Sequence, residues 1–110
     1  MIITTTNEIP NQEIVEILGI VKGTTIRAKH LGKDIVAGFR HLIGGELKEY
    51  TEMIKEARDI AFGMMVKEAE GLQADAIVGI RFSTTSVMQG AAEILVYGTA
   101  VKLKPKTQNR

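Results

Sequence analysis

The chain contains two histidines, His30 and His41, and imidazole is the commonest metal ligand in proteins. A stable zinc site needs three or four ligands, and the sequence offers no cysteine to complete one. If residues 30–41 are helical throughout, the two rings lie about 16 Å apart along the axis, too far to share an ion. A metal site would need a bend or histidines from neighbouring subunits. The sequence favours ordinary surface or helix-end histidines, and we expect no metal or other cofactor within one chain.

A second candidate for chemistry is an anion site at Gly44 and Gly45, where the sequence predicts the start of a long helix. The glycines allow a sharp turn and leave the first N–H groups of the helix uncovered, which favours an anion. Arg40, one turn earlier, and Arg81, on a later strand, could lie over the same point. The alternative is that the glutamates of the first helical turn already complement the dipole, with Arg40 pairing to one of them.

Familiar catalytic and nucleotide-binding motifs are missing. The sequence has no G-x-G-x-x-G and no G-x-x-x-x-G-K-[ST], and Ser83 and Ser86 lie outside any G-x-S-x-G elbow. Met53, Met64 and Met65 could supply thioethers to Cu(I), but they lie on the apolar arc of the long helix, where methionine fills gaps. We therefore predict no catalytic residue.

Charge and hydropathy restrict the partners. A formal net charge of +1 is too balanced for a chain that mainly neutralises phosphates. No apolar run approaches the roughly 20 residues needed to cross a bilayer, and the N-terminus has no signal-peptide pattern. We expect no nucleic-acid partner, no membrane partner and a cytoplasmic location.

The length of 110 residues fits one domain, predicted at 1–103, followed by a flexible basic tail at 104–110. Alternating apolar positions and turn residues predict an α+β protein in which a long amphipathic helix packs on an antiparallel sheet, with a short helix in addition. The expected elements are a short strand at 2–6, a hairpin with arms 14–21 and 24–28 around a Lys22-Gly23 turn, a short helix within 32–45, a long helix from Glu46 to about Glu70 closed by a left-handed Gly71, and strands at 75–85 and 92–103.

The predicted strands are apolar on both faces, whereas an antiparallel sheet with one wet face alternates apolar with polar residues. If side chains alternate strictly, one face of the first strand carries Ile14, Leu18 and Ile20, and the other face carries Val15, Ile17 and Val21. In the strand after the long helix, one face carries Ala76, Val78, Ile80 and Phe82, and the other carries Ile77, Gly79, Arg81 and Ser83. The long helix has an apolar arc of roughly 200°, where about 100° suffices to pack on one sheet. One helix cannot cover both faces, so either the short helix or another subunit does; the spare apolar surface favours a subunit.

Three stretches of the sequence resemble the YbjQ-like family: IGG…KEY at 43–50, QADAIVGIRF at 73–82 and YGTAV at 97–101. The resemblance extends over nearly the whole chain. It implies a dodecin-like β-α-β-β arrangement and a ring assembly, typically a homopentamer, so the expected partner is the chain itself. It also implies the family's customary label, "putative heavy-metal-binding", although this sequence has neither a cysteine nor a compact histidine cluster.

Three functional hypotheses remain open. The first is a ring-forming binding or scaffold module without catalysis. The second is a metal-binding protein whose ligands meet only between subunits. The third and weakest is a small-molecule enzyme with its site at subunit contacts.

Overall fold

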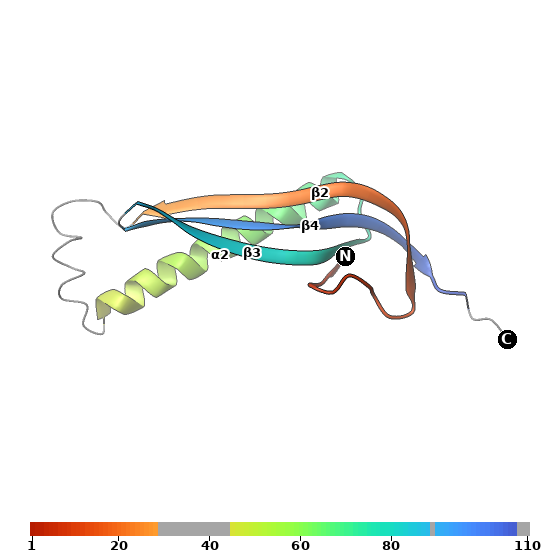
Figure 1. Cartoon of the computed structure of the whole chain (residues 1–110), viewed down its shortest axis with the longest axis horizontal. Helices are drawn as coiled ribbons and strands as arrows, with labels where there is room; N and C mark the ends of the chain where they lie inside the picture. Colours follow the sequence, from red (N-terminus) through yellow and green to blue (C-terminus); the bar gives the residue numbers. More distant parts are fainter. Residues whose placement is uncertain (29–44, 89, 108–110) are drawn as a thin grey trace.

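The computed structural model describes residues 1–28, 45–88 and 90–107. Within these residues the chain forms strands β1 (Ile2–Ile3), β2 (Gln12–Ala28), β3 (Ala76–Met88) and β4 (Ala91–Pro105), and helix α2 (Gly45–Gly71). The helix crosses one face of the sheet diagonally (Figure 1). The α+β class and the β-α-β-β order of the long elements are confirmed. The predicted short helix lies almost wholly outside the described residues.

The sheet has the strand order β1-β3-β4-β2. Its three long strands are antiparallel neighbours, as predicted. The short β1 pairs parallel with the first residues of β3, so the complete sheet is mixed. Because β4 is central, β2 forms one edge of the sheet, and β3 forms the other edge beyond its short pairing with β1.

Residues 12–28 form one continuous strand, so the predicted hairpin with a turn at Lys22-Gly23 is wrong. The glycine has a different purpose. A Cβ atom at position 23 would overlap the backbone carbonyl oxygen of Ala61 in α2. Gly23 therefore lets the helix approach the backbone of β2 directly, a role of glycine that local turn patterns do not reveal.

The hydrophobic core lies between α2 and the sheet. Four residues at successive i, i+4 positions of α2 are fully buried: Ala57, Ala61, Met65 and Ala69. They pack on Val21, Ile77, Ile80, Ile94, Val96 and Ala100. The predicted helix bounds are correct to within a residue or so, but the left-handed residue after the helix is Gln73, with φ 59°, and not Gly71.

Irregular pairing in the strands changes which residues share a face. In β3 the register shifts between Val78 and Arg81, where Gly79 has φ 64°. Ile80 consequently joins the core, and the ring of Phe82 stacks on Phe62 of α2 with a centroid separation of 6.3 Å. Arg81 faces away from the helix. The strict alternation predicted for residues 76–83 is therefore wrong beyond the bulge.

Two register shifts in β2 have the same effect, between Ile14 and Glu16 and between Ile17 and Gly19. Ile14, Ile17 and Ile20 lie on the face opposite α2, as their pairing with β4 shows. Leu18 and Val21 lie on the helix side, where they contact the core. The predicted two-faced apolar strand is thus present, with different residues on each face.

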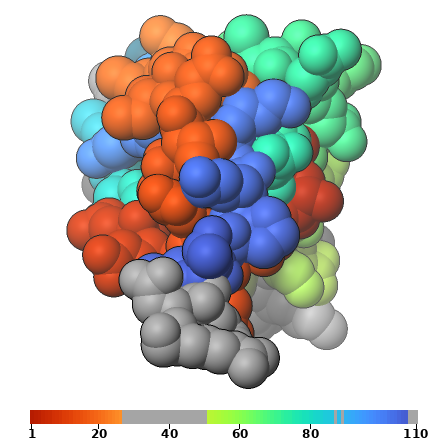
Figure 2. Space-filling model, turned by 90° about the vertical axis from the view of Figure 1, so that its right-hand side faces the viewer, coloured from red at the N-terminus to blue at the C-terminus, as the bar shows by residue number. Residues whose placement is uncertain are grey.

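The end of the chain is tied to the sheet up to at least residue 106. β4 runs to Pro105, so the domain boundary predicted at 103 and 104 falls inside this strand. The backbone N–H of Lys106 donates to the carbonyl oxygen of Asn11 at 3.0 Å. Figure 2 shows this end of the molecule, where the surfaces of β2 (orange) and β4 (blue) lie side by side.

The molecule is elongated, with extents of 67 × 24 × 16 Å. Its radius of gyration is 18.6 Å, against about 13 Å for a compact domain of this length.

Candidate functional site

The face of the sheet opposite α2, here called the open face, carries large exposed apolar side chains. Ile17, Ile20 and Ile26 of β2 are 71%, 74% and 61% exposed, and Tyr97 of β4 is 40% exposed. Single exposed apolar residues are normal on a protein surface, but a group on one sheet face indicates an interaction surface. The open face is therefore the main candidate for binding.

One end of the open face is covered by the chain itself. Ile9 and Ile14 pack on Ala76, Val78 and Val101 there, forming a second, smaller apolar cluster. Ile9 belongs to the N-terminal arm, residues 4–11, which connects β1 to β2. The arm thus covers the start of β3, and among the described residues no other segment packs on the rest of this face.

Hydrogen bonds to β3 hold the N-terminal arm in place. The N–H of Gly79 donates to the carbonyl oxygen of Thr6 at 2.9 Å, and that of Ile80 to Thr4 at 3.2 Å. Nη1 of Arg81 donates to the carbonyl oxygens of Thr5, at 2.9 Å, and Ile80, at 2.8 Å. The bulge in β3 is therefore the anchor of the arm, and Arg81 is part of that anchor.

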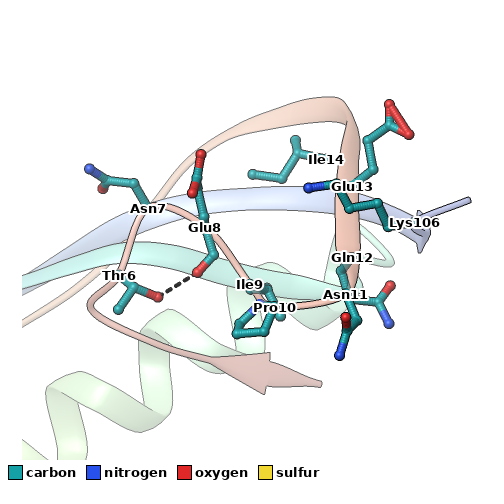
Figure 3. A pocket seen from close by; sticks show the side chains of 10 residues that line it. All are labelled: Thr6, Asn7, Glu8, Ile9, Pro10, Asn11, Gln12, Glu13, Ile14 and Lys106. Atoms are coloured by element: carbon teal, nitrogen blue, oxygen red, sulfur yellow. Dashed lines mark hydrogen bonds between the residues drawn. The ribbon is translucent and has the colours of Figure 1, made fainter. Parts of the chain in front are cut away.

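The arm and the first residues of β2 enclose an open hollow of about 800 Å³ (Figure 3). Its lining comes from residues 6–14 and Lys106, and it combines polar side chains with the apolar ones of Ile9, Pro10 and Ile14. The hydroxyl of Thr6 donates to the carbonyl oxygen of Glu8 at 2.7 Å, which fixes the curve of the arm. Beside it, Glu13 pairs with Lys104 at 3.7 Å.

The two long edges of the sheet differ in their protection. On β2, the outward N–H of Lys22 donates to Oε1 of Glu68 in α2 at 3.2 Å. This bond covers one backbone group of an edge that is otherwise a template for another strand. The second half of β3, from Arg81 to Met88, forms the opposite edge and pairs only with β4 among the described residues.

The residues predicted to bind an anion are only partly described. Gly45 is the first residue of α2, and Arg81 lies on β3 with its guanidinium on the N-terminal arm. Arg40 and Gly44 lie outside the described residues, as do His30 and His41. Convergence of Arg40, Gly44, Gly45 and Arg81 on one anion therefore stays a prediction, and so does any metal role of the histidines.

The described residues do not suit a metal ion within one chain. Among residues 1–28, 45–88 and 90–107, no three His, Cys, Asp or Glu side chains lie together, and the whole sequence lacks cysteine. Several carboxylates serve the fold instead: Asp75 accepts the N–H of Leu103 at 2.8 Å and pairs with Lys102 at 3.8 Å. The same described part contains no helix long and apolar enough to span a membrane.

Sequence reasoning missed the hollow and the true composition of the open face. The hollow depends on a positive φ of 64° at Asn11 and on hydrogen bonds between distant segments. The proline-containing run NEIPNQ, residues 7–12, is typical of a turn, but nothing in it fixes where the chain folds back. The composition of the open face depends on bulges, which shift every later side chain to the other face.

Comparison with known proteins gives a consistent group of relatives. A family model described as "Putative heavy-metal-binding" matches residues 1–104. A "UPF0145 protein" of Thermosipho melanesiensis is 62% identical over 106 residues, covering 96% of this chain and 98% of the relative. A UPF0145 protein from Archaeoglobus fulgidus is 57% identical over 104 residues, covering 94% of this chain and 96% of the relative. Another from Thermus thermophilus is 56% identical over 105 residues, covering 96% of this chain and 92% of the relative.

A solved structure supports the fold. The crystal structure of a protein of unknown function from Pediococcus pentosaceus matches with a TM-score of 0.61, covering 94% of this chain and 98% of that one. The two sequences are 19% identical, so this similarity bears on the arrangement of the elements and not on any ligand.

Proposed function

We propose that this chain, which belongs to the YbjQ-like family, acts as a homo-oligomeric binding or scaffold module in the cytoplasm. Five copies is the number that the family resemblance leads us to expect. The open face and the free edges of the sheet are the surfaces that the copies bury. The proposal assigns no catalysis to the chain.

The observation that carries the proposal is the open face. Three isoleucines of β2 are more than half exposed on a face that α2 does not reach. A group of large apolar side chains on one face of a sheet is typical of a surface that another protein covers.

The unlike edges of the sheet favour a ring over a two-fold dimer. One edge is β2, 17 residues long and partly covered by α2 through Glu68. The other is the second half of β3, with few contacts to the helix. Contacts between two different surfaces are head-to-tail, and they close into a ring when the rotation between copies allows it.

The test is the mass of the protein in solution by light scattering at micromolar concentration. We expect several times 12.0 kDa for the wild type. Ile20→Lys should reduce the mass, because a lysine at a covered position buries a charge. Leu72→Lys is the matched control, since Leu72 is also an exposed apolar residue, at 43%, but lies at the end of α2. A monomeric wild type, or equal masses for all three proteins, would refute the proposal.

A second candidate function, metal binding between subunits, is favoured by the description of the matching family. In this hypothesis His30 or His41 from neighbouring copies would complete a site that no single chain forms. Calorimetric titration of demetallated protein with Zn²⁺ and Cu²⁺ tests it. Binding of one metal per chain, lost in His30→Ala or His41→Ala, would support this function; absence of binding in assembled wild type would exclude it.

A further inference from the structure

A row of polar side chains crosses the open face between its apolar residues. Tyr97 of β4 is the register partner of both Lys22 on β2 and Arg81 on β3, so the three residues lie side by side on the same face. Neighbouring strands are about 4.8 Å apart, which places the backbones of Lys22 and Arg81 roughly 10 Å apart with the tyrosine between them. The side chains of Lys22 and Arg81 both leave the sheet on the face that carries the phenol.

The two cations of this row have no carboxylate partner in the described residues. The ion pairs there join Lys102 to Asp75 and Lys104 to Glu13, at the other end of β4. Glu68 is close to Lys22 in the chain's fold, but its carboxylate accepts the backbone N–H and not the ammonium. Covering two unpaired cations without an anion would be costly, because a charge removed from water needs a counter-charge.

Within the strands of the open face, hydroxyl groups lie closer to this row than carboxylates do, and the N-terminal arm adds the carboxylate of Glu8, three residues from Thr5. The next row contains Thr24 and Ser83, on either side of Leu95. The row after that contains Glu93, four residues from Tyr97 along β4, or about 13 Å. The surroundings of Lys22, Tyr97 and Arg81 therefore combine positive charge with hydroxyl donors.

Arg81 is held in position before any ligand arrives. Its Nη1 donates to the carbonyl oxygens of Thr5 and Ile80. A guanidinium has five N–H donors in a fixed plane, so the bonds of Nη1 leave the other nitrogens available. Anchoring lowers the entropy lost when the side chain binds an oxyanion.

We infer that the Lys22–Tyr97–Arg81 row binds an oxyanion of the phosphate class on the open face. Lys22 provides a mobile charge, Tyr97 a hydroxyl donor, and Arg81 an oriented guanidinium. The row is formed by one chain, so the site does not depend on the proposed assembly. Where copies cover the open face, the bound anion neutralises the two cations between them.

The experiment titrates inorganic phosphate into the full-length protein at constant ionic strength, set with potassium chloride, and follows binding by calorimetry. Lys22→Gln keeps the backbone bond to Glu68 and should weaken phosphate binding at least about tenfold, as expected for a hydrogen bond to a charged group. Tyr97→Phe removes only the hydroxyl and should weaken it severalfold. The matched control is Lys55→Gln, on the exposed side of α2, which should bind like the wild type.

Equal phosphate affinity in wild type and Lys22→Gln, or no saturable binding in the wild type, would overturn the site. The mass of each sample is measured in parallel. If Lys22→Gln fails to assemble at every phosphate concentration, the row binds a carboxylate of a neighbouring copy instead of an anion. That result would also overturn the anion site. A monomeric wild type that binds phosphate through Lys22 would refute the assembly and support the anion site.

Discussion

The two faces of the sheet differ in whether a described segment covers them. On the covered face, α2 presents alanines at positions 57, 61 and 69, and β2 presents Gly23, so the backbones lie close together. Large residues of the sheet, such as Ile77 and Ile94, are fully buried there. On the open face, β2 presents Ile17, Ile20 and Ile26, all exposed. The chain thus completes the contacts of its large apolar residues on the covered face, whereas no described segment does so for these three isoleucines.

This difference separates two energetic roles. Substitutions on the covered face should lower the free energy of unfolding of the chain, because they disturb a close-packed core. Substitutions on the open face should leave the isolated fold nearly unchanged and alter association instead. The predictions below start from the largest expected effect on the covered face.

Gly23→Ala should have the largest effect. Its Cβ would overlap the carbonyl oxygen of Ala61, and neither backbone can yield without separating α2 from β2. We expect a loss of about 3 kcal/mol or more in the free energy of unfolding, measured by urea denaturation at matched protein concentration. Gly63→Ala is the control: its Cβ would meet nothing within 4 Å, and helix propensity predicts a gain of up to about 1 kcal/mol. Equal urea midpoints for the two variants would contradict the close approach.

Gly98→Val should have a somewhat smaller effect. A Cβ there would lie 2.7 Å from Cγ2 of Ile77 and 2.9 Å from Cγ1 of Ile80, which are side-chain atoms with some freedom to move. The expected cost is about 1–3 kcal/mol by thermal or urea unfolding. Combining it with Ile77→Ala should cost less than the sum of the two single changes, because the second creates space for the first. Strict additivity would show that the two side chains do not compete.

Glu13→Gln should have the smallest effect. The Glu13–Lys104 pair spans 3.7 Å, and both side chains are about half exposed, at 52% and 56%. Exposed pairs of this kind contribute about 0–1 kcal/mol, so the urea midpoint should move little. A shift of the urea midpoint as large as that expected for Gly98→Val would mean that the ion pair beside the hollow contributes substantially to the stability of the fold.

The sequence predicted the parts of the fold that follow from periodicity. The long helix at 45–71, the strands after it and the α+β class all follow from apolar spacing. The hairpin was wrong because Lys22-Gly23 has the local pattern of a turn, whereas the need for glycine comes from Ala61, 38 positions away. No pattern of neighbouring residues in the sequence can reveal that contact.

The candidate site was less accessible to sequence reasoning. The excess of apolar residues on the strands correctly indicated a second apolar face, but bulges at Gly79 and in β2 decided which residues occupy it. The predicted turn at Lys22-Gly23 is wrong, so the alignment of Lys22 with Tyr97 and Arg81 could not be foreseen. Cross-strand register is a tertiary property, set by packing over the whole sheet.

The central claim, that copies of the chain cover the open face, is tested most directly by thiol labelling. The sequence has no cysteine, so a single introduced one gives an unambiguous probe. We predict that Ile20→Cys, 74% exposed in the isolated chain, is protected from a maleimide at micromolar protein concentration, whereas Lys55→Cys on α2 reacts at the rate of a free thiol. In denaturant both should react equally fast. Rapid labelling of Ile20→Cys in the native protein, at the rate of the Lys55 variant, would contradict the account.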